Sequence, residues 1–321
     1  MGRMRDSLKH QMRTAALDGI QRNDTRKAYR RACDAFSVWA KDQGIRDREE
    51  VTADVIQRYE AYLEGRPERY TPATIHAKLA PVCKVAGISM KEIRKPKRTA
   101  GQIKRGRSET KTGRGEREAA DPRYRRLVEL QRCTGIRRAE LARLEGRDLI
   151  RENGQLYVMV RSGKGGKDQK QWIIPEDRET VARIFDGVGE NERVFSPEEM
   201  SNHINLHSMR AQHAQQCYFY YVGLITRSES AQEALRGVLL RRWESGHEEL
   251  KERDRGRYSA TWARFISDMD NRPYLLRGEN RQKAEELGLP VEYCRLALMA
   301  VSVFHLSHWW LDVTTTNYMI K

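Results

Sequence analysis

Apolar residues recur at helical intervals through the first 90 positions of the chain. Asp24 and Thr52 are suitable N-caps at the start of two such segments, and Thr71 followed by Pro72 predicts the start of a third helix. Pro81 lies inside this third segment, where the missing backbone N–H predicts a kink or an early end. The pattern therefore predicts a bundle of short helices.

The pattern changes after position 120. Asp121–Pro122 is expected to begin a helix and Gly135 to break it. Apolar residues then alternate over 156–160, a Gly- and Lys-rich turn covers 162–168, and residues 172–174 are expected to form the return strand. This segment predicts a β-hairpin with lysines at its tip.

The last third of the chain reads as helical again. The residues Ser196–Glu199 form a capping box, expected to start a helix that leads into His207. A continuous apolar run over 296–304 predicts a buried helix, and Asp312 is expected to cap a short final helix carrying Tyr318. The predicted fold class is therefore mainly α with a small β-hairpin or sheet (α+β).

Composition excludes several classes of protein. Of 321 residues, 39% are apolar, and the nine-residue run at 296–304 falls short of the roughly 20 residues that span a bilayer. The N-terminus carries no apolar segment typical of a secretory signal. Five scattered cysteines do not suggest a disulfide framework. We therefore expect a cytoplasmic protein with no membrane partner.

Charge then indicates the partner. The chain has 60 Lys and Arg against 45 Asp and Glu, a net charge of +15, which favours nucleic acid. Residues 91–118 carry a net +7 with few large apolar side chains, so they are expected to form a basic linker between domains 1–90 and 119–321. The candidate DNA-binding residues are Lys95, Lys97, Arg98, Lys104, Arg105, Arg107 and, on the hairpin, Lys167.

The second domain offers side chains for phosphoryl transfer without a metal ion or other cofactor. It contains arginines beside predicted turns, a lysine on the hairpin, two histidines and a late tyrosine, with no acidic cluster suited to Mg²⁺. Guanidinium groups can stabilise charge on phosphorus, and a tyrosine hydroxyl can attack it if a base takes its proton and an acid protonates the leaving oxygen.

The order of five motifs resembles the tyrosine recombinase (phage integrase) family. The motifs are Thr-Gly-Ile-Arg-Arg-Ala-Glu-Leu at 134–141, Gly-Lys-Gly-Gly-Lys at 163–167, His-Ser-Met-Arg at 207–210, Leu-Ser-His at 306–308, and Tyr318. The resemblance covers 119–321 as a catalytic domain, and residues 1–90 look like the family's helical core-binding domain.

The resemblance implies a role for each matching residue. It makes Tyr318 the nucleophile and Lys164 the acid for the 5′ oxygen, with Lys167 the less favoured alternative for that role. His207 becomes the candidate base, and Glu140 supports the first arginine. The residues expected to stabilise charge on phosphorus are Arg137, Arg210 and His308.

Three departures from the family pattern stand out. Arg210 and His308 are 98 residues apart, more than is usual, so an inserted helical subdomain is expected at about 216–289, with a role in protomer or accessory DNA contacts. Tyr318 lies ten residues after His308, one more than the common spacing, which predicts a bulge at Trp309 and Trp310. Three residues follow Tyr318, so the expected protomer contact is short or lies elsewhere.

A zinc site is the alternative interpretation of the histidines. The residues His203, His207, His213 and Cys217 include pairs at i,i+4 spacing, but His203 and His213 lie ten residues apart, too far along one helix to close around one ion. We therefore expect no metal site.

The expected function is a site-specific DNA recombinase, an integrase that cuts and rejoins DNA through a 3′-phosphotyrosine to integrate or excise a mobile element. The resemblance implies double-stranded DNA as partner, a homo-tetramer on two sites, a possible directionality factor and a nucleoid-associated prokaryotic location. A type IB topoisomerase and a non-catalytic DNA-binding accessory protein are the alternatives.

Overall fold

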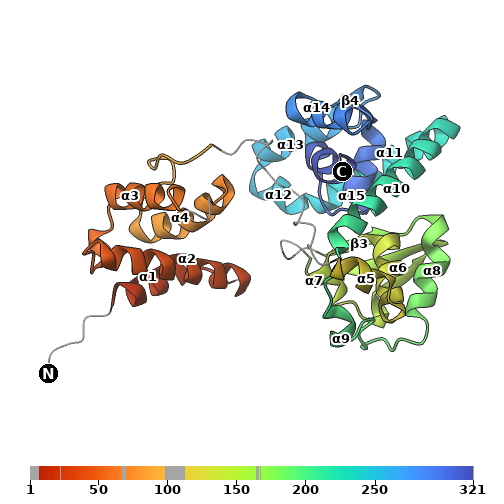
Figure 1. The fold of residues 1–321 in the computed structure, drawn as a ribbon. Helices are drawn as coiled ribbons and strands as arrows, with labels where there is room; N and C mark the ends of the chain where they lie inside the picture. Colours follow the sequence, from red (N-terminus) through yellow and green to blue (C-terminus); the bar gives the residue numbers. More distant parts are fainter. Residues whose placement is uncertain are drawn as a thin grey trace. The chain divides into compact units, whose positions relative to one another are not determined.

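Two units make up the chain, Met1–Lys104 and Arg105–Lys321. The computed structural model describes residues 7–21, 23–66, 70–97, 113–163, 166 and 168–320 (Figure 1). The division between the units falls inside the expected basic linker, and residues 98–112 of that linker lie outside the described residues.

The first unit is a helical bundle around one core. Thr52 and Thr71 cap helices as the sequence predicts, because their side chains accept from the backbone N–H of Val55 and Thr74. Apolar faces of all four helices meet in one buried cluster that includes Phe36. The helices are α1 (Leu8–Leu17), α2 (Asn23–Asp42), α3 (Ala53–Glu64) and α4 (Pro72–Ala86), with a 3₁₀ turn at Arg48–Glu50.

The expected early end at Pro81 is wrong. Helix α4 continues through Pro81 to Ala86 and ends at Gly87, which adopts the left-handed conformation at φ 69°. Pro81 removes one backbone donor, whereas Leu79 and Val82 beside it are fully buried in the bundle core. Tertiary packing therefore outweighs the local penalty.

The second unit begins with helices packed around a three-stranded sheet. Strand β2 pairs antiparallel with β1 and β3, so that Val158 lies opposite Leu149 and Gln171. The return strand covers Gln169–Trp172, three residues earlier than predicted, and β1 was not predicted. The elements are α5 (Arg114–Ala120), α6 (Arg125–Thr134), α7 (Arg138–Leu141), β1 (Leu149–Glu152), β2 (Gln155–Val160), β3 (Gln169–Trp172), α8 (Arg178–Phe185) and α9 (Pro197–Met200), with 3₁₀ turns at Pro122–Tyr124, Gly146–Asp148 and Pro175–Asp177.

The glycine and N-cap signals in the sequence located both ends of α6 well, but the start of the helix that carries His207 poorly. Gly135 ends α6 at φ 59°, and Asp121 caps the turn before α6. The Ser196 capping box is present, but it opens only the single turn α9. A separate helix, α10 (Leu206–Arg227), carries His207 and is capped by Asn205.

The segment expected as an insertion consists mainly of helices. Its first residues continue α10, and Leu239, Trp243 and Phe265 lie in the same buried cluster as α15 and Tyr318. Strands β4 and β5 pair antiparallel at its end. The elements are α11 (Glu229–Gly246), α12 (Glu248–Arg253), α13 (Arg255–Ser267), β4 (Pro273–Leu275), α14 (Gly278–Glu286) and β5 (Glu292–Cys294).

The described chain ends in an unusual turn. Helix α15 (Arg295–Phe304) is buried as predicted, and α16 (Leu311–Thr314) runs into a π-helical turn at Thr315–Met319. Asp312 lies inside α16 rather than at its cap. The widened turn lies at Thr315–Met319, not at Trp309–Trp310, where Trp309 instead packs against Phe265 at a ring-centroid distance of 5.4 Å.

The architecture is thus mainly α with a small antiparallel β part, which confirms the predicted fold class. Among the described residues, none of the helices combines the length and apolar character needed to cross a membrane.

We predict that Trp243→Ala destabilises the whole second unit by about 3–5 kcal/mol, because Trp243 is fully buried in a core that α10, α11 and α15 share. Guanidinium denaturation followed by far-ultraviolet circular dichroism measures the change. Val238→Ala, on the exposed side of the same helix, is the control and should change stability little. Local loss of α11 protection in hydrogen exchange, with α15 unaffected, would contradict a shared core.

Candidate active site

Arg137 is positioned by the turn between α6 and α7. Gly135 lets the chain reverse after α6, and Arg137 then stands at the N-cap of α7. The buried Glu140 carboxylate accepts from the Arg137 backbone N–H at 3.1 Å and from its Nη1 at 2.9 Å. One acid therefore fixes both the backbone and the guanidinium of Arg137.

Arg210 lies on α10 and is 2% exposed. Its Nη2 donates to the Leu306 carbonyl at 3.0 Å, its Nη1 to the Gly135 carbonyl, and its Nε to the Tyr318 hydroxyl at 3.3 Å. These contacts use three of its five N–H donors. Burial lowers the pKa of Arg210, and the charge of Arg137 adds to this, while Tyr318 and Glu140 oppose it.

The Leu306 carbonyl brings the two arginines together. It accepts from Arg137 Nη2 at 3.2 Å and from Arg210 Nη2 at 3.0 Å. Because Glu140 supplies one negative charge against two guanidiniums, this place carries a net positive charge and suits an anion such as a phosphate diester.

Tyr318 is 7% exposed and lies between two histidines. Its ring centroid is 5.9 Å from that of His207 and 6.4 Å from that of His308, whose ring is inclined by 26°. The Gln215 side chain donates to the Tyr318 backbone carbonyl at 3.0 Å. The phenol oxygen is thus held beside Arg210, with both imidazoles next to the ring.

His308 follows a residue in a conformation that favours glycine. Ser307 has φ 59°, in the left-handed region that side chains other than glycine rarely adopt. The His308 backbone N–H donates to the Ser302 carbonyl at 3.0 Å, and its Nδ1 accepts from the Trp310 backbone N–H at 3.5 Å. The turn after α15 therefore directs both the Leu306 carbonyl and the His308 ring.

The structure thus brings together Arg137, Glu140, Arg210 and Tyr318 by hydrogen bonds, with His207 and His308 against the Tyr318 ring. Lys164 and Lys167 lie outside the described residues.

The expected linker contacts are only partly described. Lys95 donates its Nζ to the Met90 and Ile93 carbonyls and is half-buried, whereas Lys97 is exposed. The candidates Arg98, Lys104, Arg105 and Arg107 lie outside the described residues.

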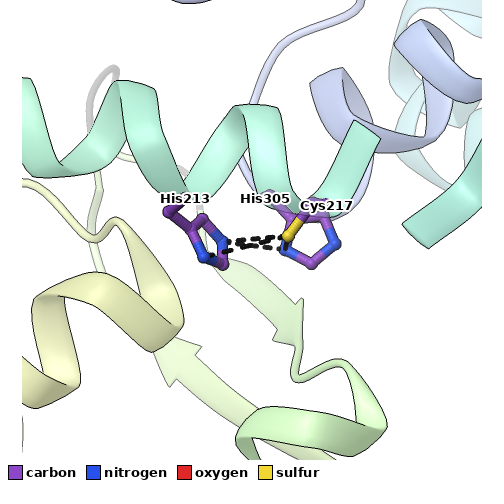
Figure 2. Close-up of side chains that lie close together, drawn as sticks. All are labelled: His213, Cys217 and His305. Carbon is purple, nitrogen blue, oxygen red and sulfur yellow. Dashed lines mark hydrogen bonds between the residues drawn. The ribbon is translucent and has the colours of Figure 1, made fainter. Parts of the chain in front are cut away.

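The four residues of the zinc alternative do not meet. His203 pairs with Glu118, its Nδ1 lying 3.4 Å from the carboxylate. His213 and Cys217 instead lie beside His305, and all three are buried (Figure 2). His305 was missed because it lies 92 positions from His213 and belongs to none of the motifs.

No family model matches the chain, and the curated proteins contain no match. Among solved structures, the chain resembles the crystal structure of XerA recombinase, at 19% identity, with 65% of this chain and 82% of that chain covered and a TM-score of 0.23.

We predict that Gly135→Ala destabilises the second unit more than Gly154→Ala. Both glycines have positive φ, so both variants carry a conformational penalty of about 1–2 kcal/mol. Only at position 135 would the new Cβ lie 2.8 Å from His213 Cδ2 and 3.3 Å from Arg210 Cγ, whereas nothing lies within 4 Å at Gly154.

The difference between the two midpoints in thermal or denaturant unfolding isolates the steric effect. Equal midpoints would show that the turn tolerates a Cβ and that Arg210 is not held closely by it.

Proposed function

We propose that this chain is a tyrosine recombinase, a DNA strand-cleaving and rejoining enzyme that acts through a covalent 3′-phosphotyrosine at Tyr318. The observation that carries the proposal is the contact between Arg210 Nε and the Tyr318 hydroxyl, beside a second guanidinium on the same carbonyl. A nucleophile next to two converging cations is the arrangement that metal-independent phosphoryl transfer needs.

In the proposed first step the Tyr318 oxygen attacks the scissile phosphorus. A bond from this oxygen to phosphorus forms and the bond from phosphorus to the 5′ oxygen breaks. The phenol proton passes to His207 as candidate base, and Lys164 protonates the departing 5′ oxygen. The added charge on phosphorus is stabilised by Arg137, Arg210 and His308.

Rejoining reverses these steps. The 5′ hydroxyl of a partner strand attacks the phosphotyrosine and releases Tyr318, so no nucleotide is consumed and no metal ion takes part in the proposal. Glu140 acts through Arg137, since its carboxylate orients that guanidinium.

The larger assembly is part of the same proposal. The helical first unit and the catalytic second unit would grip double-stranded DNA, with the basic linker on the backbone phosphates and four chains on two sites. The natural reaction would be integration or excision of a mobile element.

The segment 216–289 is proposed as an insertion that supports the nucleophile within its own chain. Asn280 of α14 donates to the Thr316 hydroxyl at 3.0 Å, and Lys283 donates to the Ile320 carbonyl at 3.3 Å. The first contact falls on the turn that carries Tyr318, and the second on Ile320, the residue that follows the turn. The expected role in protomer or accessory DNA contacts stays a prediction.

We predict that the full-length chain forms a denaturant-resistant adduct with nicked duplexes from the ends of its own element, in EDTA. Tyr318→Phe should abolish the adduct, since it removes the attacking oxygen. Tyr258→Phe, in α13, should form it as the unmodified chain does. Denaturing gel electrophoresis measures the adduct.

An adduct that persists in Tyr318→Phe, or one that EDTA prevents, would contradict the proposed chemistry. Relaxation of plasmids without any element sequence would indicate a topoisomerase instead. Site-specific binding with no adduct from any of the chain's own ends would indicate an accessory protein.

We predict that Arg137→Lys slows adduct formation by about 10²-fold, because an ammonium group cannot reproduce two directed guanidinium bonds. The exposed Arg151 of β1 gives a matched control, and Arg151→Lys should leave the rate unchanged. Single-turnover cleavage at saturating protein separates this effect from DNA affinity. Equal rates for both variants would show that the Arg137 guanidinium does not contribute to cleavage.

A further inference from the structure

Three side chains capable of binding a metal ion meet in the core of the second unit. His213 and Cys217 lie one turn apart on α10, and His305 follows the last residue of α15 (Figure 2). One ligand atom from each lies within 4.8 Å of the others. Their exposed fractions are 1%, 0% and 0%.

Burial disfavours the protonated form of both imidazoles. Burial, with the charge of Arg210, lowers the pKa of His213 to about 3, and burial also holds the pKa of His305 well below its ordinary value. A neutral imidazole keeps the nitrogen lone pair that a metal ion requires.

The outer nitrogen of each ring already has a partner. His213 Nδ1 lies 2.9 Å from the Arg132 carbonyl, which accepts a hydrogen bond from it. His305 Nε2 lies 3.0 Å from the Tyr221 hydroxyl. Such second partners orient metal-binding histidines, and here they leave His213 Nε2 and His305 Nδ1 facing each other at 3.1 Å.

The spacing of the three atoms fits one ion. Cys217 Sγ lies 3.5 Å from His213 Nε2 and 3.5 Å from His305 Nδ1. Bonds of about 2.05 Å to nitrogen and 2.3 Å to sulfur at tetrahedral angles place two nitrogens about 3.3 Å apart and nitrogen about 3.6 Å from sulfur. The trigonal angles of a three-coordinate ion widen these spacings to about 3.6 Å and 3.8 Å. The observed triangle must therefore expand by a few tenths of an ångström, most of it between the two nitrogens.

Cys217 is the residue on which the inference depends. A hydrogen bond between the two rings satisfies the histidines without a metal ion, so their pairing alone proves nothing. The hydrogen bond between the two rings does not involve the Cys217 thiol. Sγ also lies 3.8 Å from His213 Nδ1, so it stands over the ring and must shift toward the line of the Nε2 lone pair on binding.

We propose that His213, Cys217 and His305 bind one thiophilic d¹⁰ metal ion, Cu⁺ or Zn²⁺. Burial holds the pKa of the Cys217 thiol well above its usual value, so binding replaces the Sγ–H proton with the metal and releases that proton to solvent. The ligand set then joins α10 to the end of α15, one residue before Leu306.

Charge and ligand number favour Cu⁺ of the two. One thiolate neutralises Cu⁺, whereas Zn²⁺ would leave a positive charge in a core that also contains Arg210 and Arg242. The described residues supply three ligand atoms, which suffice for Cu⁺, whereas Zn²⁺ would need a water as its fourth ligand.

The test measures metal, not recombination, so it stands or falls separately from the proposed function. The full-length chain, stripped with chelator under reductant, is equilibrated anaerobically with Cu⁺ or Zn²⁺ beside a competing chelator and desalted. Elemental analysis should find one ion per chain, and the loaded chain should unfold at a higher Tm. The ion that is retained identifies the metal.

Cys217→Ser and His305→Gln should each weaken retention at least 10-fold. Cys133→Ser removes another buried thiol of the same unit and should leave retention unchanged. If a variant fails to fold, as judged by circular dichroism, the absorption spectrum of the unmodified chain loaded with Co²⁺ replaces it as the test. A thiolate ligand to Co²⁺ gives a charge-transfer absorption. Failure to retain either ion, equal retention in a folded Cys217→Ser chain, or a cobalt spectrum without thiolate character would each overturn the proposal.

Discussion

The shared carbonyl of Leu306 is the constraint on which the candidate site depends. Two guanidiniums repel each other, and repulsion grows where water is excluded, so their approach needs an acceptor that both can use. Leu306 provides it, and Glu140 supplies the compensating charge on one side. The turn after α15, the turn before α7 and the buried face of α10 must therefore keep a fixed relation. Packing of the helices in the second unit holds these three segments in place.

Local chemistry in the sequence predicted local structure well. Thr52, Thr71 and Ser196 cap helices because a side-chain oxygen next to the first turn needs no distant partner. The pairing of Arg137 with Glu140 is of the same kind, three residues apart. The early end expected at Pro81 is wrong because burial of its neighbours outweighed a local rule. Contacts between residues far apart in the sequence could not be predicted from local patterns. The family resemblance indicated the order of Arg210 and Tyr318 along the chain, but not the hydrogen bond between them.

The site as described is closed. Arg210 and Tyr318 are almost fully buried, and the tyrosine hydroxyl is occupied by the guanidinium that would face a phosphate in the proposed reaction. A substrate would have to displace that contact. The turn that carries Tyr318 is restrained from two sides, by Gln215 of α10 and by α14. A change of one side-chain rotamer leaves those restraints in place. Opening of the site therefore requires the whole C-terminal segment to move relative to the helices that pack against it.

The π-helical turn at Thr315–Met319 determines the direction in which the Tyr318 side chain points. Its backbone bond joins the Ile320 N–H to the Thr315 carbonyl across five residues, so it contains one residue more than an α-helical turn. Each residue of an α-helix advances the direction of the side chain by about 100°. The wider turn thus takes up the extra residue between His308 and Tyr318 without advancing the helical phase. With the extra residue in an ordinary α-helix, the end of this segment would turn about 100° further and direct its side chains away from Arg210.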